Sequence, residues 1–245
     1  MADHAPSRTD ALARPAGAGA RPTALHTFGT PSKQGLYDPR NEHDACGVGF
    51  VAHLKGQKSH QIVRDGLFML ENLTHRGAVG ADPLMGDGAG LLAQIPDRLF
   101  REEMAAQGVT LPEPGDYAVG FVFMPQDDAE CERLKNIIAE VVAAEGQKLL
   151  GFRDVPVDNS SLSKAPEIAA TEPRHVQVFI GRGDGVEDQT SFERQLFVLR
   201  KVISNRVYGE TSGLDNGFYF VSLSTQTIVY KGMFLAYQVG AYYKD

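Results

Sequence analysis

Apolar residues recur at helical spacing in three stretches of the chain. In residues 62–73 and 192–207 they return about once per turn, and in residues 127–146 they gather opposite a charged face. Because an α-helix repeats about every 3.6 residues, this spacing predicts three amphipathic helices. Gly77 and Gly146 follow two of them, and we expect these helices to end there, with Gly77 in a left-handed cap.

Shorter apolar runs lie between these helices and predict six β-strands. The runs are residues 47–54, 91–95, 117–124, 175–181, 218–223 and 227–230. We expect residues 47–54 to form a buried strand, and residues 117–124 to be buried on both faces of a sheet, because no polar side chains alternate with their apolar ones. The last two runs are separated only by residues 224–226, which predicts an antiparallel hairpin.

The strands come in pairs around long helices. This order favours an α+β fold, with sheets stacked between helices, over a regular winding of parallel strands. A single break in composition divides the chain, because residues 1–45 are rich in Ala, Pro, Arg and Gly and show no hydrophobic period. We therefore expect a leader in residues 1–45 and one folded domain in residues 46–245.

The leader is open to two interpretations. It lacks the apolar core of about 7–15 residues that a secretory signal needs, and acidic residues such as Asp10 and Glu42 argue against an organelle transit peptide. A disordered tail and a removable propeptide both fit its polar composition. The choice between them depends on the residue that follows, Cys46.

Composition and charge narrow the class of protein. With 42% hydrophobic residues among 245, the chain can bury a substantial core. Its net charge is −7 and no basic cluster occurs, so nothing points to a nucleic-acid partner. No apolar run approaches the roughly 18 residues of a membrane-spanning helix, so no membrane partner is expected. Two cysteines are too few for a disulfide framework, which favours the cytoplasm.

Cys46 is the leading candidate for chemistry. Most unpaired cysteines are small buried residues, and we expect Cys131 to be one of them. Cys46 differs because it is the first residue of the predicted domain. If the bond between Ala45 and Cys46 is cut, the new α-amino group, with an ordinary pKa of about 7.7–8.0, can accept the thiol proton. Judged by its own segment, Cys46 is more often a small buried residue, and a nucleophile that processing activates is the alternative.

Two further segments bear on a site. The guanidinium of Arg76 is a planar fork of donors that suits the amide or carboxylate of a substrate. The alternative is that Arg76 is a solvated residue that interacts with the last carbonyl groups of the helix. Its neighbour His75 is expected to make a structural hydrogen bond. The glycine-rich residues 85–90 lack the pattern of a nucleotide loop and predict a tight turn that passes close to the site. Residues 181–185 predict a surface loop, and the histidines show no metal-ligand spacing.

Several short motifs follow one another in a specific order. They are Gly35-Leu36-Tyr37-Asp38-Pro39, Asp44-Ala45-Cys46-Gly47-Val48-Gly49-Phe50, Leu73-Thr74-His75-Arg76-Gly77-Ala78, Gly86-Asp87-Gly88-Ala89-Gly90 and Ile228-Val229-Tyr230-Lys231-Gly232-Met233. As an ordered set they resemble the large (α) subunit of bacterial glutamate synthase, at its N-terminal class II glutamine amidotransferase domain. The resemblance covers the chain from about residue 35 to its C-terminus.

The resemblance implies a fold and a chemistry. The fold is that of the N-terminal nucleophile (Ntn) hydrolases, a four-layer αββα sandwich, with residues 1–45 as a propeptide. Cys46 is expected to attack the side-chain amide of L-glutamine through a thioester, and Arg76 to bind the substrate. The ammonia would pass to synthase domains, which use it to convert 2-oxoglutarate into L-glutamate and so carry out ammonia assimilation. The electrons for this step would come through FMN and an iron–sulfur cluster from a small electron-donating subunit. No cofactor is expected within this chain.

One departure from the family pattern bears on activity. In the family an Arg-Phe-Ser-Thr segment and then an Asn-Gly pair, which supplies oxyanion-hole donors, follow the Tyr-Lys-Gly strand. Here the chain ends at Asp245 with neither segment after this strand. Oxyanion donors contribute roughly 3–4 kcal/mol each. We therefore expect an N-terminal fragment of the domain, incomplete at its C-terminus, with little or no glutaminase turnover alone.

Two alternatives stay open. A class II amidotransferase with another ammonia acceptor keeps the fold, but such relatives expose the cysteine directly after the initiator Met, and the long leader argues against them. A non-catalytic interaction domain would leave the bond between Ala45 and Cys46 intact, with Cys46 simply buried.

Overall fold

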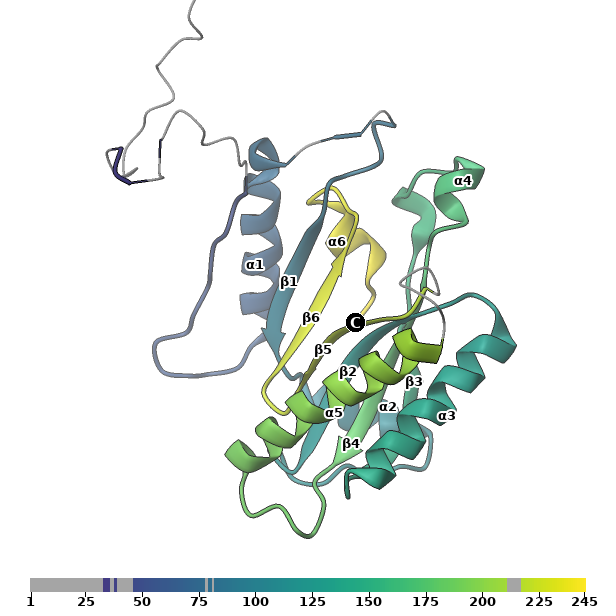
Figure 1. Cartoon of the computed structure of the whole chain (residues 1–245). Helices are drawn as coiled ribbons and strands as arrows, with labels where there is room; N and C mark the ends of the chain where they lie inside the picture. The colour runs from purple at the N-terminus through teal and green to yellow at the C-terminus, as the bar shows by residue number, and fades with distance from the viewer. Residues whose placement is uncertain (1–32, 36–37, 39–45, 78, 81, 211–216) are drawn as a thin grey trace, which may run out of the picture. The chain divides into compact units, whose positions relative to one another are not determined.

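The structure of the protein is a computed structural model (Figure 1) that describes residues 33–35, 38, 46–77, 79–80, 82–210 and 217–245. The chain divides into two units, residues 1–44 and residues 45–245. Within the first unit, Lys33 Nζ and Asp38 Oδ2 form an ion pair of 2.9 Å. All helices and strands named below belong to the second unit.

The second unit contains both helices and antiparallel strands. In chain order they are α1 (His60–Asn72), the 3-10 turn η4 (Thr74–Arg76), β1 (Ala89–Gln94), α2 (Asp97–Ala106), β2 (Tyr117–Met124), α3 (Asp128–Ala144), β3 (Lys148–Asp154), the 3-10 turn η5 (Asn159–Ser161), α4 (Pro166–Ala169), β4 (Arg174–Gly181), α5 (Gln189–Glu210), β5 (Tyr219–Ser224), β6 (Thr227–Gly232) and α6 (Gln238–Tyr242). The α+β class predicted from the sequence is therefore confirmed.

The three predicted helices are present as α1, α3 and α5, each within a few residues of its expected bounds. Helix α3 begins after Asp127, whose carboxylate accepts the backbone N–H of Glu130 at 2.8 Å. A side-chain acceptor at this position satisfies one of the free N–H groups of the first turn. Gly146 follows the helix at a φ of +70°, a conformation that glycine adopts without strain.

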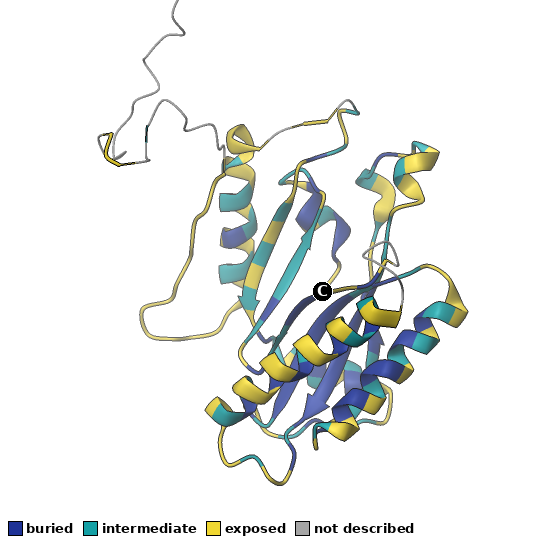
Figure 2. Ribbon diagram, in the orientation of Figure 1, coloured by how far each residue is buried: buried dark blue, intermediate teal, exposed yellow. Residues whose placement is uncertain are grey.

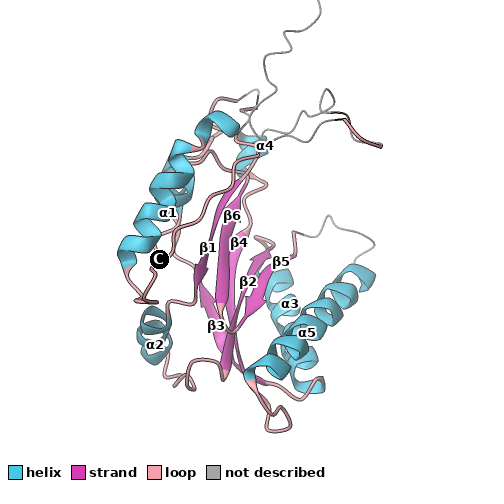
Figure 3. Cartoon of the chain, turned by 90° about the vertical axis from the view of Figure 1, so that its left-hand side faces the viewer, coloured by secondary structure: helices cyan, strands magenta, loops and turns pink. Residues whose placement is uncertain are grey.

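The strands form two antiparallel sheets. One has the order β3-β4-β2-β5, and the other consists of β1 and β6. In the second sheet Ala89 lies opposite Gly232 and Gln94 opposite Thr227. Figure 3 shows the strands running between α1 and α2 on one side and α3 and α5 on the other.

Two hydrophobic clusters hold these elements together. The first joins the inner faces of α3 and α5 to one face of the four-stranded sheet. The second joins the opposite face of that sheet to β6, α2 and α6. Strand β2 contributes to both clusters, with Val122 in the first and Phe121 in the second. The prediction that residues 117–124 are buried on both faces is therefore confirmed, as the dark strands of Figure 2 show.

Residues 47–54 do not form the buried strand that their apolar pattern predicts. They follow an irregular, exposed course, and the side chains of Val48 and Phe50 are 94% and 89% exposed. None of the described strands forms a ladder with them. The segment instead runs along α1, where Gly47 lies against Leu73. An apolar run needs a neighbouring strand to pair with, and a run of side chains alone does not specify one.

The predicted hairpin of residues 218–230 is also wrong in its pairing. Both strands exist, but β5 is the edge of the four-stranded sheet and β6 pairs with β1. The chain passes from one sheet to the other between Ser224 and Thr227. Glu193 of α5 stabilises this crossing, because its Oε1 accepts hydrogen bonds from Ser224 Oγ, Thr225 N and Thr225 Oγ1 at 2.9, 2.7 and 2.6 Å.

The conformation of Gly77 differs from the left-handed cap that the sequence predicts. Its φ and ψ are −94° and 161°, because η4 follows α1 and the chain then leaves in an extended course. A Cβ at this position would lie 3.4 Å from Asp87 Oδ1, which places that carboxylate beside the turn.

Candidate active site

The end of α1 places Arg76 at a fixed point. The helix continues into η4, where the N–H of Arg76 donates to Leu73 O at 2.8 Å and the N–H of Gly77 donates to Thr74 O at 3.1 Å. His75 Nδ1 lies 3.0 Å from Asn72 O, the structural hydrogen bond expected of that residue. This turn presents the Arg76 side chain toward residue 46 rather than along the helix.

Cys46 and Arg76 lie together, although thirty positions separate them in the chain. Arg76 donates from Nε and from Nη2 to the backbone carbonyl oxygen of Cys46, at 3.3 and 3.2 Å. Two donors of one guanidinium on one oxygen fix the direction of that peptide group. Cys46 is exposed, so the alternative of a cysteine simply buried in a core does not fit it.

The glycine-rich turn forms a second wall beside these residues. Gly86 packs against the backbone of Phe234 and Leu235, where a Cβ would clash with the carbonyl group of Phe234. Residues 87–89 line the same pocket as Cys46 and Arg76, so the glycine-rich segment passes close beside these two residues. The turn is held from the other side by Asp82, whose Oδ1 accepts the N–H of Leu84 at 2.8 Å. The hydroxyl of Ser163 and this N–H lower the pKa of Asp82 below its ordinary value.

A pocket of about 240 Å³ lies among these segments. It is lined by residues 46–48, by the end of α1 with η4, by residues 87–89 and by residues 234–236. Four of the five motifs that carry the family resemblance therefore meet at or beside one pocket, because β6 brings Gly232 opposite Ala89. The fifth motif, residues 35–39, lies mostly outside the described residues.

The pocket carries three side chains that bear on chemistry. Its lining includes the thiol of Cys46, the guanidinium of Arg76 and the carboxylate of Asp87, and its other side chains are apolar or neutral. Sequence reasoning singled out the first two and missed Asp87. The available signal was a charged residue between two glycines, placed immediately before a strand. A cation and an anion beside a thiol can bind a small zwitterion next to a nucleophile.

The other sequence candidates lie outside this pocket. Cys131 is fully buried in the cluster between α3 and the four-stranded sheet, as the sequence predicts. The loop of residues 181–185 is held by an ion pair of 2.7 Å between Arg182 and Asp116. Among the residues that the structure describes, no group of three His, Cys, Asp or Glu side chains could hold a metal ion. In that same part of the chain, no helix is both long and apolar enough to cross a membrane.

Comparison with known proteins adds a family. Residues 46–245 match the family described as glutamine amidotransferases class-II. The match begins at Cys46 itself, the residue that the composition break and the pocket single out independently.

Curated relatives match over most of this chain. It is 49% identical over 215 residues to the glutamate synthase [NADPH] large chain of Bacillus subtilis, which covers 88% of this chain and 14% of the relative. It is 41% identical over 220 residues to the glutamate synthase [NADH] of Schizosaccharomyces pombe, a match that covers 88% of this chain and 10% of the relative. It is 39% identical over 210 residues to the ferredoxin-dependent glutamate synthase 2 of Arabidopsis thaliana, covering 86% and 13%. The chain thus spans only a small part of each relative.

Proposed function

Since this chain belongs to the class II glutamine amidotransferases, we propose that Cys46 is the nucleophile that releases ammonia from the side-chain amide of L-glutamine, and that full turnover also requires the oxyanion-hole donors of the family. The observation that carries this proposal is the exposed Cys46 at a pocket, with its carbonyl group fixed by two donors of Arg76. A nucleophile held in one orientation beside a substrate pocket avoids much of the entropy cost of attack.

The reaction follows from the groups at the pocket. Cleavage of the bond between Ala45 and Cys46 frees an α-amino group, which accepts the thiol proton. The sulfur then attacks the amide carbon, the amide nitrogen takes a proton and leaves as ammonia, and a γ-glutamyl thioester remains. Water attacks the thioester, which releases glutamate and restores the thiol. Before cleavage the nitrogen of Cys46 is an amide and cannot act as the base.

We assign Arg76 to substrate binding as well as to orientation of Cys46. Its guanidinium lines the pocket, and a planar fork of donors suits a carboxylate. Residues 1–45 are, in the same proposal, a propeptide, and residues 46–245 belong to the amidotransferase domain. The division of the chain into units at residues 44 and 45 supports this boundary. For the fold we propose the αββα sandwich of Ntn hydrolases, supported by two sheets that run between helices.

The relatives are glutamate synthases, which suggests where the ammonia is used. We propose that the ammonia passes to synthase domains of a glutamate synthase, which form L-glutamate from 2-oxoglutarate, with FMN, an iron–sulfur cluster and an electron-donating subunit. The residues of this chain do not fit a cluster, because such clusters take several cysteine thiolates and Cys131 is enclosed in a core. FMN and the cluster are therefore assigned to other domains. A nucleophilic thiol suits the reducing cytoplasm, which we propose as the compartment.

Mass spectrometry of the expressed full chain tests this proposal. We expect loss of residues 1–45, and then covalent labelling of Cys46 by a diazoketone analogue of L-glutamine. The analogue should label at least about tenfold faster than its D-enantiomer, since a thiol in a stereospecific pocket distinguishes them. Cys131→Ser is the matched control and should label normally, whereas Cys46→Ser should not label at all. An intact chain whose Cys46 reacts equally with both enantiomers would favour the non-catalytic interaction domain.

A further inference from the structure

Gln238, the first residue of α6, is a fully buried polar side chain that the proposed reaction does not use. Its Oε1 accepts the backbone N–H of Leu235 at 2.7 Å. Its Nε2 donates to the carbonyl oxygens of Leu84 and Ser161, at 3.0 and 2.9 Å. One amide therefore joins three backbone segments that are far apart in the chain.

Two of these segments belong to, or lead into, two walls of the Cys46 pocket. Leu235 lies in the wall of residues 234–236, and Leu84 lies in the turn that leads to Asp87 in the other wall. Gly86 packs directly on the backbone of Leu235 between the two walls. The separation of the walls is thus set at two places, by the contact of Gly86 and by the hydrogen bonds of Gln238.

The side-chain amide of Gln238 is chemically suited to joining these backbone segments. A primary amide offers one acceptor and two donors in a single plane, and here all three are used by backbone groups. A carboxylate keeps the acceptor but repels the two carbonyl oxygens, and a thioether of equal length offers no donor. In a site closed to water, each unmatched backbone group weakens the folded arrangement.

We propose that Gln238 is a positioning residue of the Cys46 pocket, which holds the wall of Asp87 and the wall of Leu235 at the separation that the substrate requires. This inference rests on the proposed function and deepens it. Gln238 does not touch the reacting atoms, so its loss should alter how tightly substrate binds more than how fast bound substrate reacts.

The test compares Gln238→Met with Gln147→Met in the full chain. Gln147 is a matched control, because it is also buried and also joins backbone groups, accepting from Gly183 N at 2.9 Å and donating to Glu145 O at 3.1 Å, but neither of these groups belongs to a wall of the pocket. The rate of Cys46 labelling is measured against the concentration of the diazoketone analogue of L-glutamine, alongside labelling by iodoacetamide. Amide hydrogen exchange reports on residues 82–88 and 233–237.

For Gln238→Met we expect a roughly fivefold to tenfold higher half-saturating concentration of the analogue, the scale of about one net hydrogen bond, with iodoacetamide labelling within about twofold. Hydrogen exchange should quicken in both walls. Gln147→Met should lower the unfolding temperature without either effect. If Gln238→Met does not fold, Gln238→Asn tests the same hydrogen bonds, because it keeps the amide on a shorter side chain.

The two possible failures are distinguishable. Unchanged exchange in both walls, or quicker exchange with an unchanged half-saturating concentration, overturns the positioning role of Gln238. Equal labelling of the unsubstituted chain by both enantiomers of the analogue overturns the proposed function instead, whatever the exchange shows.

Discussion

At the scale of single residues, Arg76 sets the direction of Cys46. We expect Arg76→Ala to slow labelling of Cys46 by the diazoketone analogue at least about tenfold, because two charge-assisted hydrogen bonds to its carbonyl oxygen are lost. Thermal unfolding should change little, since both residues are exposed. Arg98→Ala is the control, an exposed arginine paired with Glu102. A normal labelling rate for Arg76→Ala contradicts the assigned role.

His175 gives the folded state a pH dependence. It is enclosed by Phe121, Phe123, Tyr242 and Tyr243, and burial lowers its pKa from 6.5 to about 4, while the nearby carboxylate of Glu172 opposes the shift. Between pH 6.5 and about 4 the unfolded chain binds a proton that the folded chain does not. The free energy of unfolding should therefore fall as the pH is lowered through this window, by up to about 1.4 kcal/mol per pH unit.

The substitution His175→Phe should flatten this part of the profile, measured by urea unfolding at pH 7 and pH 5. The exposed His60, replaced by Gln, serves as the control and should leave the slope as it is. An unchanged slope in His175→Phe assigns the pH dependence to other groups.

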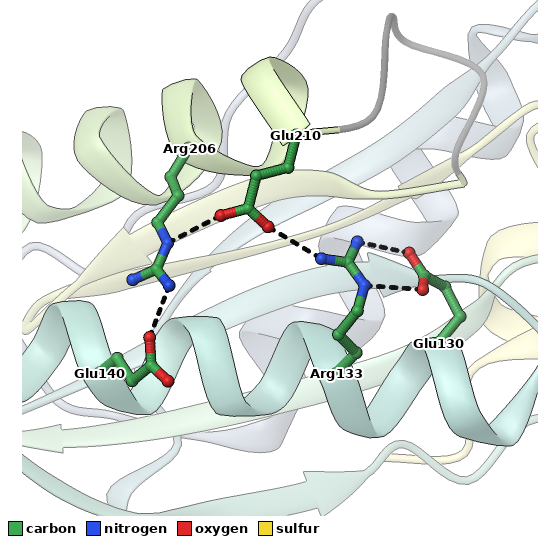
Figure 4. A network of polar contacts seen from close by, with 5 residues as sticks. All are labelled: Glu130, Arg133, Glu140, Arg206 and Glu210. Carbon is green, nitrogen blue, oxygen red and sulfur yellow. Dashed lines mark hydrogen bonds and ion pairs between the residues drawn. The ribbon is translucent and has the colours of Figure 1, made fainter.

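At the scale of elements, α3 and α5 are joined in two ways. Their inner faces pack into the first hydrophobic cluster. On their outer side, Arg133 binds Glu130 and Glu210, and Arg206 binds Glu210 and Glu140, at N···O distances of 2.5–3.0 Å (Figure 4). All five side chains are partly in water, where ion pairs contribute little.

We therefore expect packing to dominate the link between α3 and α5. Leu199→Ala, in the fully buried face of α5, should lower the free energy of unfolding by about 2–5 kcal/mol. Arg206→Ala should lower it by about 1 kcal/mol or less. Urea unfolding of both variants at low and high salt measures the difference. Similar losses in the two variants at low salt would show that the charged side chains, rather than the packing, hold the helices together.

Local sequence patterns were sufficient to predict the helices and strands whose formation depends mainly on their own residues. Helix α3 has an amphipathic face and its own cap at Asp127, and β2 has an unbroken apolar run, so both were predicted closely. The course of residues 47–54 and the pairing of β6 depend on which strand lies alongside, and that information is not local. Helix α6, which is short, strand β3, which Gly151 interrupts, and helix α2 were not predicted. Helix α2 did carry a local signal that the sequence reasoning missed, an amphipathic pattern that buries Phe100 and Met104.

The residues of the candidate site show the same contrast between local and non-local information. Cys46 and Arg76 were predicted because each stands out in its own segment, the first by its place after the leader and the second by its motif. Asp87 and Gln238 gain their positions from contacts across the fold, with residues 77 and 84 respectively. Asp87 had only a weak local signal, its place between two glycines before a strand, and Gln238 had none, so the structure is needed to identify them.

At the scale of the whole molecule, the crossing at residues 224–227 joins the four-stranded sheet to the two-stranded sheet. We expect Glu193→Ala to lower the free energy of unfolding by about 1–3 kcal/mol, because the N–H of the buried Thr225 and two hydroxyl groups lose their acceptor. Glu193→Gln keeps an oxygen in place and should cost less. Urea unfolding compares them, and equal losses would show that charge rather than hydrogen bonding matters.

The pairing of β1 with β6 also affects the order in which parts of the chain fold during synthesis. A strand that begins at Ala89 finds its partner only in the strand that ends at Gly232, and the wall of residues 234–236 comes later still. Contacts between such distant parts of a chain form slowly and after local ones. During synthesis, Cys46 and Arg76 therefore leave the ribosome long before the pocket around them can close. Under the proposed function the thiol gains its base only on cleavage, so it would not attack an amide during that interval.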